Sequence, residues 1–298
     1  MKPLEEFCFA CGGTEFDRHT KEYRRCKSCG HEVLTATQEQ GFIINDYLCE
    51  KDVRRMTGLD RFKASVLRLF DNGMDRKRLL DIGSASGKFL YHNSARYLQA
   101  IGIEVTPESL KFSRQVLGLE IVDDIQKVPD EISVATAWHS LEHIPERHLL
   151  ALLDGLSRKM VAGSRLVVSV PNGASWQYRW FGTAYAYFDV PNHLHQFTPD
   201  SLGRLMQRFG LQHVATVSSW PYNIFGYTQS LLNVMTRTHN YLYYRLKRRS
   251  RKPSFALDIA NGLLLLVFVP VGWLLGLADA VNLKSQGVIT ACFEKKTC

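Results

Sequence analysis

The stretch LLDIGSASGKFL, residues 79–90, decides the fold class of this chain. An apolar run containing the acid Asp81 leads through a turn with Gly83, Ser84 and Gly87 into an amphipathic segment. Glycines at such a turn let backbone N–H groups approach a bound group with no side chain between them. The stretch predicts a strand, a ligand-binding turn and a helix, although such a turn is equally typical of a structural strand-to-helix junction.

Two further acids favour a nucleoside ligand. Glu104 ends the next apolar run, 23 residues after Asp81, and a carboxylate there can accept hydrogen bonds from both ribose hydroxyls. In the motif VDDI, Asp124 ends the third run, close to where an adenine amino group would be read. The alternative is that these acids are only surface charges at strand ends. Together with the glycine turn they predict a nucleoside-binding site.

Short apolar runs alternate with amphipathic stretches after Arg78, which predicts an α/β fold with a parallel sheet and covering helices. Two helices should begin with a threonine N-cap followed by proline, at Thr106 and Thr198. The expected strands are residues 78–82, 100–104, 120–122, 132–137, 164–170, 211–218 and 287–294. An earlier helix is expected near residues 60–70, with an apolar stripe of Phe62, Val66, Leu67, Leu69 and Phe70.

Four motifs carry a family resemblance that covers about residues 79–210: LLDIGSASG, IGIEVTPESL, ATAWHSLEHIPE and DVPNHLHQFTPDSL. They resemble the class I methyltransferases, in particular the group that includes ubiquinone-biosynthesis O-methyltransferases and methyltransferases of bacterial cell-surface sugar clusters. The resemblance implies a Rossmann-like seven-stranded sheet whose last strand is antiparallel. It also implies S-adenosylmethionine as cofactor, with Trp138 packing on the adenine and the other contacts made by Asp81, Gly83, Gly87, Glu104 and Asp124.

The chain departs from this family at Ala85, where glycine is usual. A dehydrogenase also combines a glycine turn with a ribose-binding acid, but its G-x-G-x-x-G motif does not occur here. The motif WHSLEH has no place in a dehydrogenase either. We therefore expect a methyltransferase.

The motif WHSLEH follows the fourth expected strand, where a proton acceptor would stand. Methyl transfer is an in-line displacement, so the protein mainly aligns the nucleophile and removes its proton. His139, Glu142 and His143 can face one way on a helical turn, and His193, near Asp189, is a further candidate catalytic residue. Three roles stay open for His143: a general base or substrate contact, a structural hydrogen bond, and a metal ligand. In the ubiquinone-biosynthesis relatives the matching positions resemble a divalent-metal site, but those relatives carry Glu where this chain has His139.

Seven aromatic residues lie between Trp176 and Phe188, too many for an ordinary surface loop. One interpretation is a lid that covers the substrate, since aromatic faces stack on sugars, rings or bases. The alternative is a small satellite core. In the lid interpretation the substrate-binding residues are Trp176, Tyr178, Trp180, Tyr185 and Tyr187, together with His195.

Two C-x-x-C pairs lie within the first 35 residues, 14 residues apart, and each pair is followed by glycine. In a reducing compartment such pairs indicate metal more often than disulfides. Tetrahedral thiolate coordination would fold a segment too small to have its own core. We predict a zinc ribbon with a structural zinc ion bound by Cys8, Cys11, Cys26 and Cys29; a redox pair is the alternative.

Residues 259–278 carry no charge and are long enough for a membrane-spanning helix. Pro270 and Gly272 interrupt this run, so the favoured interpretation is two short helices joined at Pro270. Six of the eight residues 245–252 are Arg or Lys, and a basic run beside an apolar stretch is typical of docking on anionic lipid. Three roles stay open for residues 245–283: peripheral membrane docking, a buried or dimer-forming helical pair, and a true span.

Composition fits a globular enzyme, with 298 residues, 45% of them hydrophobic and 22% charged. No signal peptide is visible, so we expect a cytoplasmic protein, with peripheral attachment at the inner face of the membrane as an open alternative. The expected segments are a zinc ribbon (1–35), a linker with N-terminal helices (36–75), the cofactor-binding core (76–219), a helical insertion (220–286) and the final strand (287–298).

The sequence thus predicts an S-adenosylmethionine-dependent methyltransferase that methylates oxygen in a small molecule or saccharide of the cell envelope. The formal net charge of +8 allows an anionic partner, so RNA methylation is the second hypothesis. A non-catalytic nucleoside-binding scaffold is the third.

Overall fold

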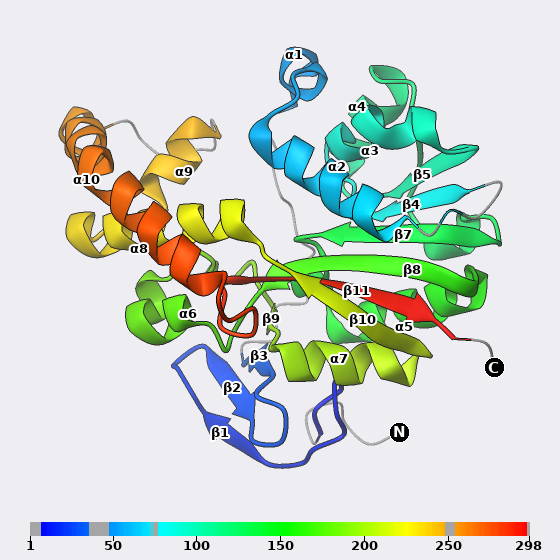
Figure 1. Cartoon of the computed structure of the whole chain (residues 1–298), viewed down its shortest axis with the longest axis horizontal. Helices are drawn as coiled ribbons and strands as arrows, with labels where there is room; N and C mark the ends of the chain where they lie inside the picture. The colour runs from blue at the N-terminus through cyan, green and yellow to red at the C-terminus, as the bar shows by residue number, and fades with distance from the viewer. Residues whose placement is uncertain (1–6, 36–47, 72, 74–76, 248–253, 297–298) are drawn as a thin grey trace.

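A seven-stranded sheet forms the centre of the molecule, in the order β10-β11-β8-β7-β4-β5-β6 (Figure 1). The computed structural model describes residues 7–35, 48–71, 73, 77–247 and 254–296. Residues 36–47 of the expected linker segment and residues 248–252 of the basic run lie outside the described residues. The strands of the sheet are β4 (Arg78–Ile82), β5 (Gln99–Ile103), β6 (Glu120–Val122), β7 (Ile132–Trp138), β8 (Met160–Pro171), β10 (Leu211–Val217) and β11 (Val288–Lys295).

The last strand differs from the others in direction. β11 runs antiparallel to both of its neighbours, β8 and β10. β4 pairs in parallel with β5 and β7, and β6 and β8 continue this parallel pairing. The predicted α/β sheet with an antiparallel last strand is therefore confirmed.

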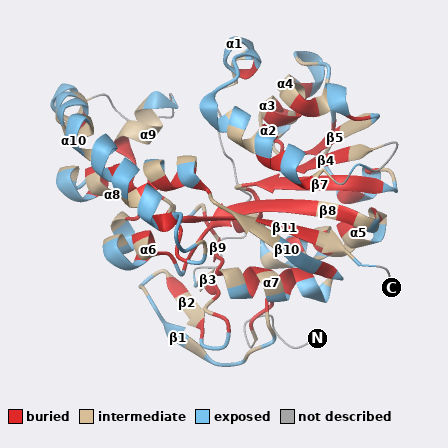
Figure 2. Ribbon diagram, viewed as in Figure 1, coloured by how far each residue is buried: buried red, intermediate tan, exposed pale blue. Residues whose placement is uncertain are grey.

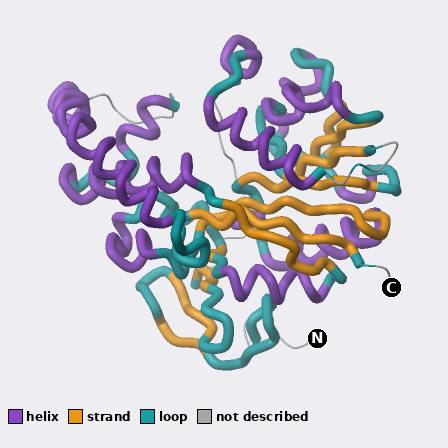
Figure 3. Tube along the Cα trace, viewed as in Figure 1, coloured by secondary structure: helices purple, strands orange, loops and turns teal. Residues whose placement is uncertain are grey.

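Helices cover both faces of this sheet (Figure 3). Successive residues of a strand point to opposite faces, so Leu79 packs with residues of α2 (Gly58–Phe70) and α3 (Lys88–Asn93). Leu80 packs instead with residues of α5 (Glu146–Lys159) and α7 (Pro199–Arg208). All residues of β7 are buried, as expected for a strand covered on both sides (Figure 2).

Three local predictions about the helices have different outcomes. The Thr198 hydroxyl caps α7 by accepting the N–H of Ser201 at 3.1 Å, as predicted. Thr106 is the N-cap residue of α4 (Pro107–Gln115), but its side chain makes no capping hydrogen bond, and its own N–H donates to Glu104 at 2.7 Å. The placement of Leu69 in the apolar stripe of α2 is wrong, because its side chain is 64% exposed.

The cysteine-rich segment shares a second sheet with the core. β1 (Phe16–Arg18), β2 (Tyr23–Cys26) and β3 (Glu32–Leu34) pair antiparallel in chain order. β3 then pairs with β9 (His195–Gln196), which precedes α7. Figure 1 shows this N-terminal module, residues 7–35, beside β9 and α7.

Three helices form a lobe between β10 and β11: α8 (Trp220–Thr236), α9 (Tyr241–Leu246) and α10 (Phe255–Asp279). The prediction of two short helices joined at Pro270 is wrong, because α10 is one continuous helix with Pro270 inside it. A proline removes the hydrogen bond to the carbonyl four residues earlier, here that of Leu266. Both residues lie on the exposed side of α10, where no neighbouring helix has to adapt to the ring.

Short elements complete the described secondary structure. They are α1 (Glu50–Arg54), α6 (Trp176–Phe181), and the 3-10 turns η1 (Ser94–Arg96), η2 (Ile125–Lys127), η3 (Leu141–His143) and η4 (Gly182–Ala184).

Candidate active site

The turn after β4 requires glycine at two positions. Gly83 and Gly87 have φ angles of 70° and 74°, in the left-handed region that L side chains rarely adopt. A Cβ on Gly83 would lie 2.5 Å from Cβ of Ser140, and one on Gly87 would lie 2.6 Å from Cδ1 of Leu119. The turn therefore packs directly against the WHSLEH motif.

Glu104 fastens this turn to the end of β5. Its Oε2 accepts the backbone N–H of Ala85 at 2.8 Å, and its Oε1 accepts those of Val105 and Thr106 at 2.9 and 2.7 Å. Ala85 itself has a φ of 48°, in the left-handed region that favours glycine. A carboxylate has about four lone-pair sites, so Glu104 can still accept ribose hydroxyls.

Asp81 lies under the turn and is buried. Its Oδ1 accepts the Thr136 hydroxyl at 2.6 Å. Burial raises the pKa of Asp81 to about 7, and the Thr136 hydrogen bond and the positive charge of Lys63 only partly oppose this rise. The carboxylate is thus poised to gain from a cationic group placed beside it.

Lys63 of α2 is a residue that sequence reasoning missed. Its Nζ lies 5.4 Å from the centroid of the Trp138 ring. Burial lowers the pKa of Lys63, while Asp81 and Asp60 favour its charged form. One signal could have found it: Lys63 follows Phe62 on the apolar side of an amphipathic helix, where a charge needs a partner.

The other predicted cofactor contacts differ in their surroundings. Ser84 and Trp138 are buried, and among the described residues neither Ser84 Oγ nor Trp138 Nε1 has a hydrogen-bond partner. The Trp138 ring packs against Phe89, with centroids 5.4 Å apart. Asp124 is exposed and caps η2 by accepting the N–H of Gln126 at 2.8 Å. Their roles toward the cofactor stay predictions.

The three predicted catalytic histidines gather around one buried carboxylate, that of Glu142. His139 Nδ1 lies 3.3 Å from Glu142 Oε1. One ligand atom each from Glu142, His143 and His193 lie within 4.8 Å of one another. The rings of His143 and His193 have centroids 4.6 Å apart. His193 comes from a distant part of the sequence, and the fold brings it to the WHSLEH motif.

The hydrogen bonds of two of these rings assign their basic nitrogens. His143 Nδ1 lies 2.9 Å from the carbonyl oxygen of Asn192, and His193 Nδ1 lies 2.8 Å from that of Tyr187. A carbonyl oxygen only accepts, so each Nδ1 carries the proton and each Nε2 is the basic atom. Such a set suits a proton acceptor, and it equally suits a divalent cation.

The carboxylate of this cluster is charged, whereas the His193 ring beside it is neutral. Burial opposes ionisation of Glu142, but the histidines around it outweigh burial and lower the pKa of the carboxyl to about 2. Burial, helped by His143, lowers the pKa of His193 to about 4. At neutral pH the cluster therefore holds an ionised Glu142 and an uncharged His193.

Aromatic side chains from two other elements close this site. The His139 ring lies 4.6 Å from the ring of Tyr222 and 5.8 Å from that of Tyr187, centroid to centroid. The Tyr187 hydroxyl donates to the backbone oxygen of Tyr222 at 2.8 Å. Tyr222 belongs to α8, so the helical lobe begins at the active site. No local pattern in the sequence indicated this contact.

The predicted aromatic lid is in part a small core. Tyr178 and Tyr185 are buried and cluster with Tyr23 of the N-terminal module. The Tyr178 hydroxyl donates to Glu32 at 2.9 Å, and the Tyr185 hydroxyl donates to a backbone oxygen beside β11 at 2.5 Å. The structure thus places these two residues as the satellite-core alternative describes.

The remaining lid residues divide. The rings of Trp176 and Trp180 stack with centroids 6.1 Å apart, and Trp180 is exposed. Tyr187 contacts His139, as described above. A direct substrate contact is therefore best supported for Tyr187 and stays a prediction for the two tryptophans.

A cavity of about 670 Å³ opens beside the glycine turn. Its walls come from α1 and α2, from Ser86 and Lys88 at the turn, and from Leu246 and Lys247 at the end of α9. The charged side chains of its lining are Asp52, Arg55, Arg61, Lys88 and Lys247. Four cations against one acid make this opening attractive to an anionic group.

The four cysteines of the N-terminal module fit a tetrahedral metal ion. Cys8 Sγ lies 3.7 Å from Cys29 Sγ, and Cys11 Sγ lies 3.6 Å from Cys26 Sγ. All four sulfur atoms lie within 4.8 Å of one another. Zn–S bonds of about 2.3 Å in a tetrahedron place sulfurs about 3.8 Å apart. The cluster is therefore compatible with zinc and too wide for disulfides.

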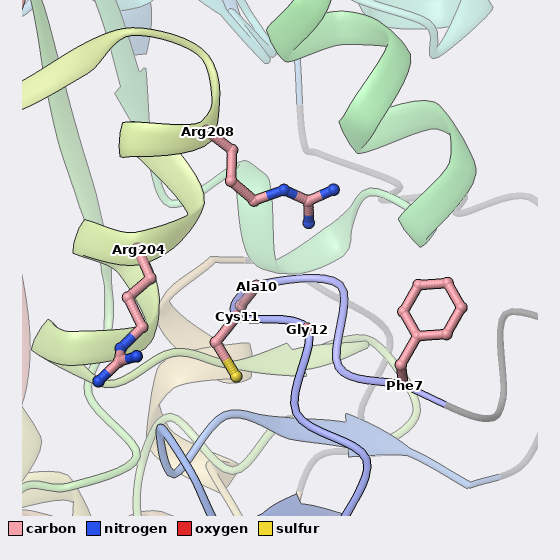
Figure 4. A pocket seen from close by; sticks show the side chains of 6 residues that line it. All are labelled: Phe7, Ala10, Cys11, Gly12, Arg204 and Arg208. Atoms are coloured by element: carbon pink, nitrogen blue, oxygen red, sulfur yellow. The ribbon is translucent and has the colours of Figure 1, made fainter.

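Two arginines of α7 lie beside the turn that holds Cys11 and Gly12 (Figure 4). Arg204 and Arg208 line a cavity of about 350 Å³ together with Phe7, Ala10, Cys11 and Gly12. Their charge complements four thiolates around one divalent cation. This cavity belongs to the cysteine module and not to the glycine turn.

His195 lies in the seam between that module and the core. Its ring stacks on His31 at 5.4 Å, and its Nε2 lies 2.9 Å from the carbonyl oxygen of Ile144. The side chain is 2% exposed, and burial lowers its pKa to about 4. This placement favours a structural role over the predicted substrate contact.

Comparisons with known proteins give one matching family and several similar structures. The methyltransferase domain family matches residues 54–216, more than half of the chain. A proposed sarcosine dimethylglycine methyltransferase from Galdieria sulphuraria has a similar structure, with 12% sequence identity, a TM-score of 0.53, and coverage of 84% of this chain and 92% of that chain. An S-adenosylmethionine-dependent methyltransferase from Archaeoglobus fulgidus is 18% identical, with a TM-score of 0.45, over 83% of this chain and 97% of that chain. No curated protein matches the sequence.

The family match covers the glycine turn, Glu104 and the WHSLEH motif. The first of these structures shares the fold of the central sheet. The chain therefore belongs to the class I S-adenosylmethionine-dependent methyltransferases.

Proposed function

We propose that this enzyme methylates a hydroxyl oxygen in a small molecule or saccharide of cell-envelope biosynthesis. The histidine cluster carries the proposal. A hydroxyl keeps its proton at neutral pH, so its methylation benefits from a proton acceptor within reach of the reacting oxygen. His143 and His193 offer such acceptors beside Glu142. The WHSLEH motif, which contains His143, also packs against Gly83 of the cofactor turn through Ser140.

We assign His143 as the base that accepts the proton of the substrate hydroxyl. The carbonyl of Asn192 holds its ring through Nδ1, which directs the basic Nε2 away from that contact. Nε2 would accept the proton of the acceptor hydroxyl, while S-adenosylmethionine held by the glycine turn and Glu104 would supply the methyl group to that oxygen. The ionised Glu142 stabilises the imidazolium that results.

The cation-lined cavity supports a phosphorylated saccharide as the substrate class. Arg55, Arg61 and Lys247 can bind a phosphate near the cofactor turn, while Lys88 also pairs with Asp60 at 2.8 Å. An aromatic face such as that of Tyr187 suits a sugar ring.

Transfer of labelled methyl groups from S-adenosylmethionine into fractionated cell extract tests the proposal. We expect label in a saccharide or small-molecule fraction. The variant His143→Gln should lose transfer by about 100-fold or more, while calorimetric affinity for S-adenosylmethionine is unchanged. The matched control is His148→Gln, an exposed histidine of α5, which should transfer normally.

Other results would assign other functions. Label in the RNA fraction, with binding that weakens steeply as salt rises, would assign RNA methylation. Absence of calorimetric S-adenosylmethionine binding would leave only a scaffold role. A requirement for Mg²⁺ whose half-saturating concentration rises in His193→Gln would make the cluster a metal site.

We also infer that the four cysteines hold a structural zinc ion. The sulfur–sulfur distances support this assignment. The ion would bind through Cys8, Cys11, Cys26 and Cys29 and would hold the N-terminal module in shape without touching the reacting atoms.

A further inference from the structure

The helix α10 exposes most of its apolar surface. Figure 2 shows much of this helix as exposed or intermediate. It is long and apolar enough to cross a membrane, with a mean hydropathy of 2.1 and only 17% of that stretch buried. Six of its large apolar side chains are more than half exposed: Phe255, Leu263, Leu266, Val267, Trp273 and Leu274. A water-soluble surface rarely presents so many together.

Only a narrow stripe of α10 packs on the protein. Its buried residues are Asn261, Gly272, Gly276 and Asp279, which recur at helical spacing. The glycines let α10 approach α8 closely, because a Cβ on Gly272 would lie 2.3 Å from Thr228 Oγ1. The rest of the described circumference of the helix is half-buried or exposed.

Both ends of α10 are tied to the same body. At its start, Asp258 accepts the Tyr241 hydroxyl at 2.8 Å and pairs with Arg245 at 3.1 Å. At its end, Asp279 accepts the Tyr227 hydroxyl at 3.0 Å. A helix of 25 residues is about 38 Å long. A helix crossing the bilayer would place one end on the far side, so these ties favour a helix that lies along a surface.

Charge distinguishes between two possible occupants of this face. Residues 245–252 carry six cations, and the exposed Arg237 and Lys284 flank the same lobe. A symmetric dimer with parallel α10 helices would bring two copies of this basic run together, which costs free energy, and an antiparallel dimer would leave both runs without an anionic partner at its ends. An anionic bilayer would attract the run and accept the apolar side chains at once.

We propose that α10 forms an interfacial membrane-docking surface for anionic phospholipid, and that the positive charge of the basic run preceding it in the sequence adds electrostatic attraction. α10 lies in the plane of the interface, with its glycine stripe on α8 and its apolar face among the acyl chains.

Docking would also place the active site at the bilayer. Leu246 and Lys247 belong to this lobe and line the cavity beside the glycine turn. Tyr222, in the first helix of the lobe, contacts His139. An acceptor carried on a lipid could then enter from the membrane plane, a consequence that rests on the proposed function.

Vesicle flotation of the full chain tests the docking surface independently of catalysis. We expect the protein to float with vesicles of phosphatidylcholine and phosphatidylglycerol, and much less with phosphatidylcholine alone. The double variant Leu266→Glu, Leu274→Glu removes two exposed leucines. Each lost leucine should lower the partition coefficient about tenfold.

The matched control is Leu98→Glu, an exposed leucine just before β5, which should float like the unchanged chain. Equal calorimetric affinity for S-adenosylmethionine would show that each variant is folded. The proposal is overturned if the unchanged chain does not float with anionic vesicles, or if the double variant floats equally well. It is also overturned if light scattering shows a dimer that the double variant dissociates while vesicles bind neither protein.

Discussion

Tyr23 and His193 are joined by a buried hydrogen bond, in which the Tyr23 hydroxyl donates to the backbone oxygen of His193 at 2.6 Å. One residue lies in the cysteine module and the other in the histidine cluster. The pairing of β3 with β9 runs beside this bond. The module therefore helps to hold His193 against His143, although it supplies no side chain to the cluster itself.

Loss of this bond should destabilise the fold. Tyr23→Phe leaves the His193 carbonyl without its donor in a buried place, which should lower the free energy of unfolding by about 1–2 kcal/mol. Urea denaturation measures this change. Tyr91→Phe is the control, because the Tyr91 hydroxyl bonds Arg54 at an exposed position and should cost less than about 0.5 kcal/mol. Equal losses in both variants would contradict the assignment.

Removal of zinc should unfold the N-terminal module first. We expect one zinc per chain by elemental analysis, and a strong chelator should make the four clustered thiols reactive. Cys29→Ser should lose the metal, whereas Cys49→Ser, outside the cluster, should keep it. Full metal retention in Cys29→Ser would count against the site.

Ala85→Gly should stabilise the chain. Ala85 has a φ of 48°, a conformation that costs an L residue about 1 kcal/mol and glycine almost nothing. Thermal unfolding should show a gain of up to that size, reduced by the greater freedom of glycine in the unfolded chain. Gly87→Ala should show the opposite sign, since its Cβ would meet Leu119.

Glu104→Gln should weaken cofactor binding by at least about tenfold. The glutamine side chain has only one accepting oxygen, and its NH₂ group cannot accept the N–H groups of the turn or the ribose hydroxyls. Isothermal calorimetry with S-adenosylmethionine measures the loss. Glu108→Gln changes an exposed acid at the start of α4 and should bind normally. Normal binding by Glu104→Gln would refute its predicted role.

Asp81 should make stability depend on pH. Its pKa is raised to about 7 in the folded chain from 3.8 in the unfolded one, so its contribution is full below about pH 4 and is lost as pH rises through about 7. Between about pH 6 and pH 8 the loss should be about 1 kcal/mol. Asp81→Asn should lack this part of the pH dependence and lose cofactor binding. An identical pH profile for both proteins would contradict the raised pKa.

Much of the fold follows from short-range patterns. The strands, the glycine turn and the C-x-x-C pairs depend on backbone conformation and periodicity within a few residues. Gly83 and Gly87 illustrate this, since each has the positive φ that its position in the turn predicts. The α/β sheet and the methyltransferase family could therefore be predicted from the sequence.

Which side chains meet in the active site depends on the packing of segments that are far apart in the sequence. Only the tertiary structure places His193 beside His143, Tyr222 over His139, and Lys63 beside Trp138. The tertiary structure likewise shows that Tyr178 belongs to a small core and that α10 is one continuous, largely exposed helix. Local sequence specifies the conformation of each segment, whereas the partner of a side chain depends on the packing of segments far apart in the chain.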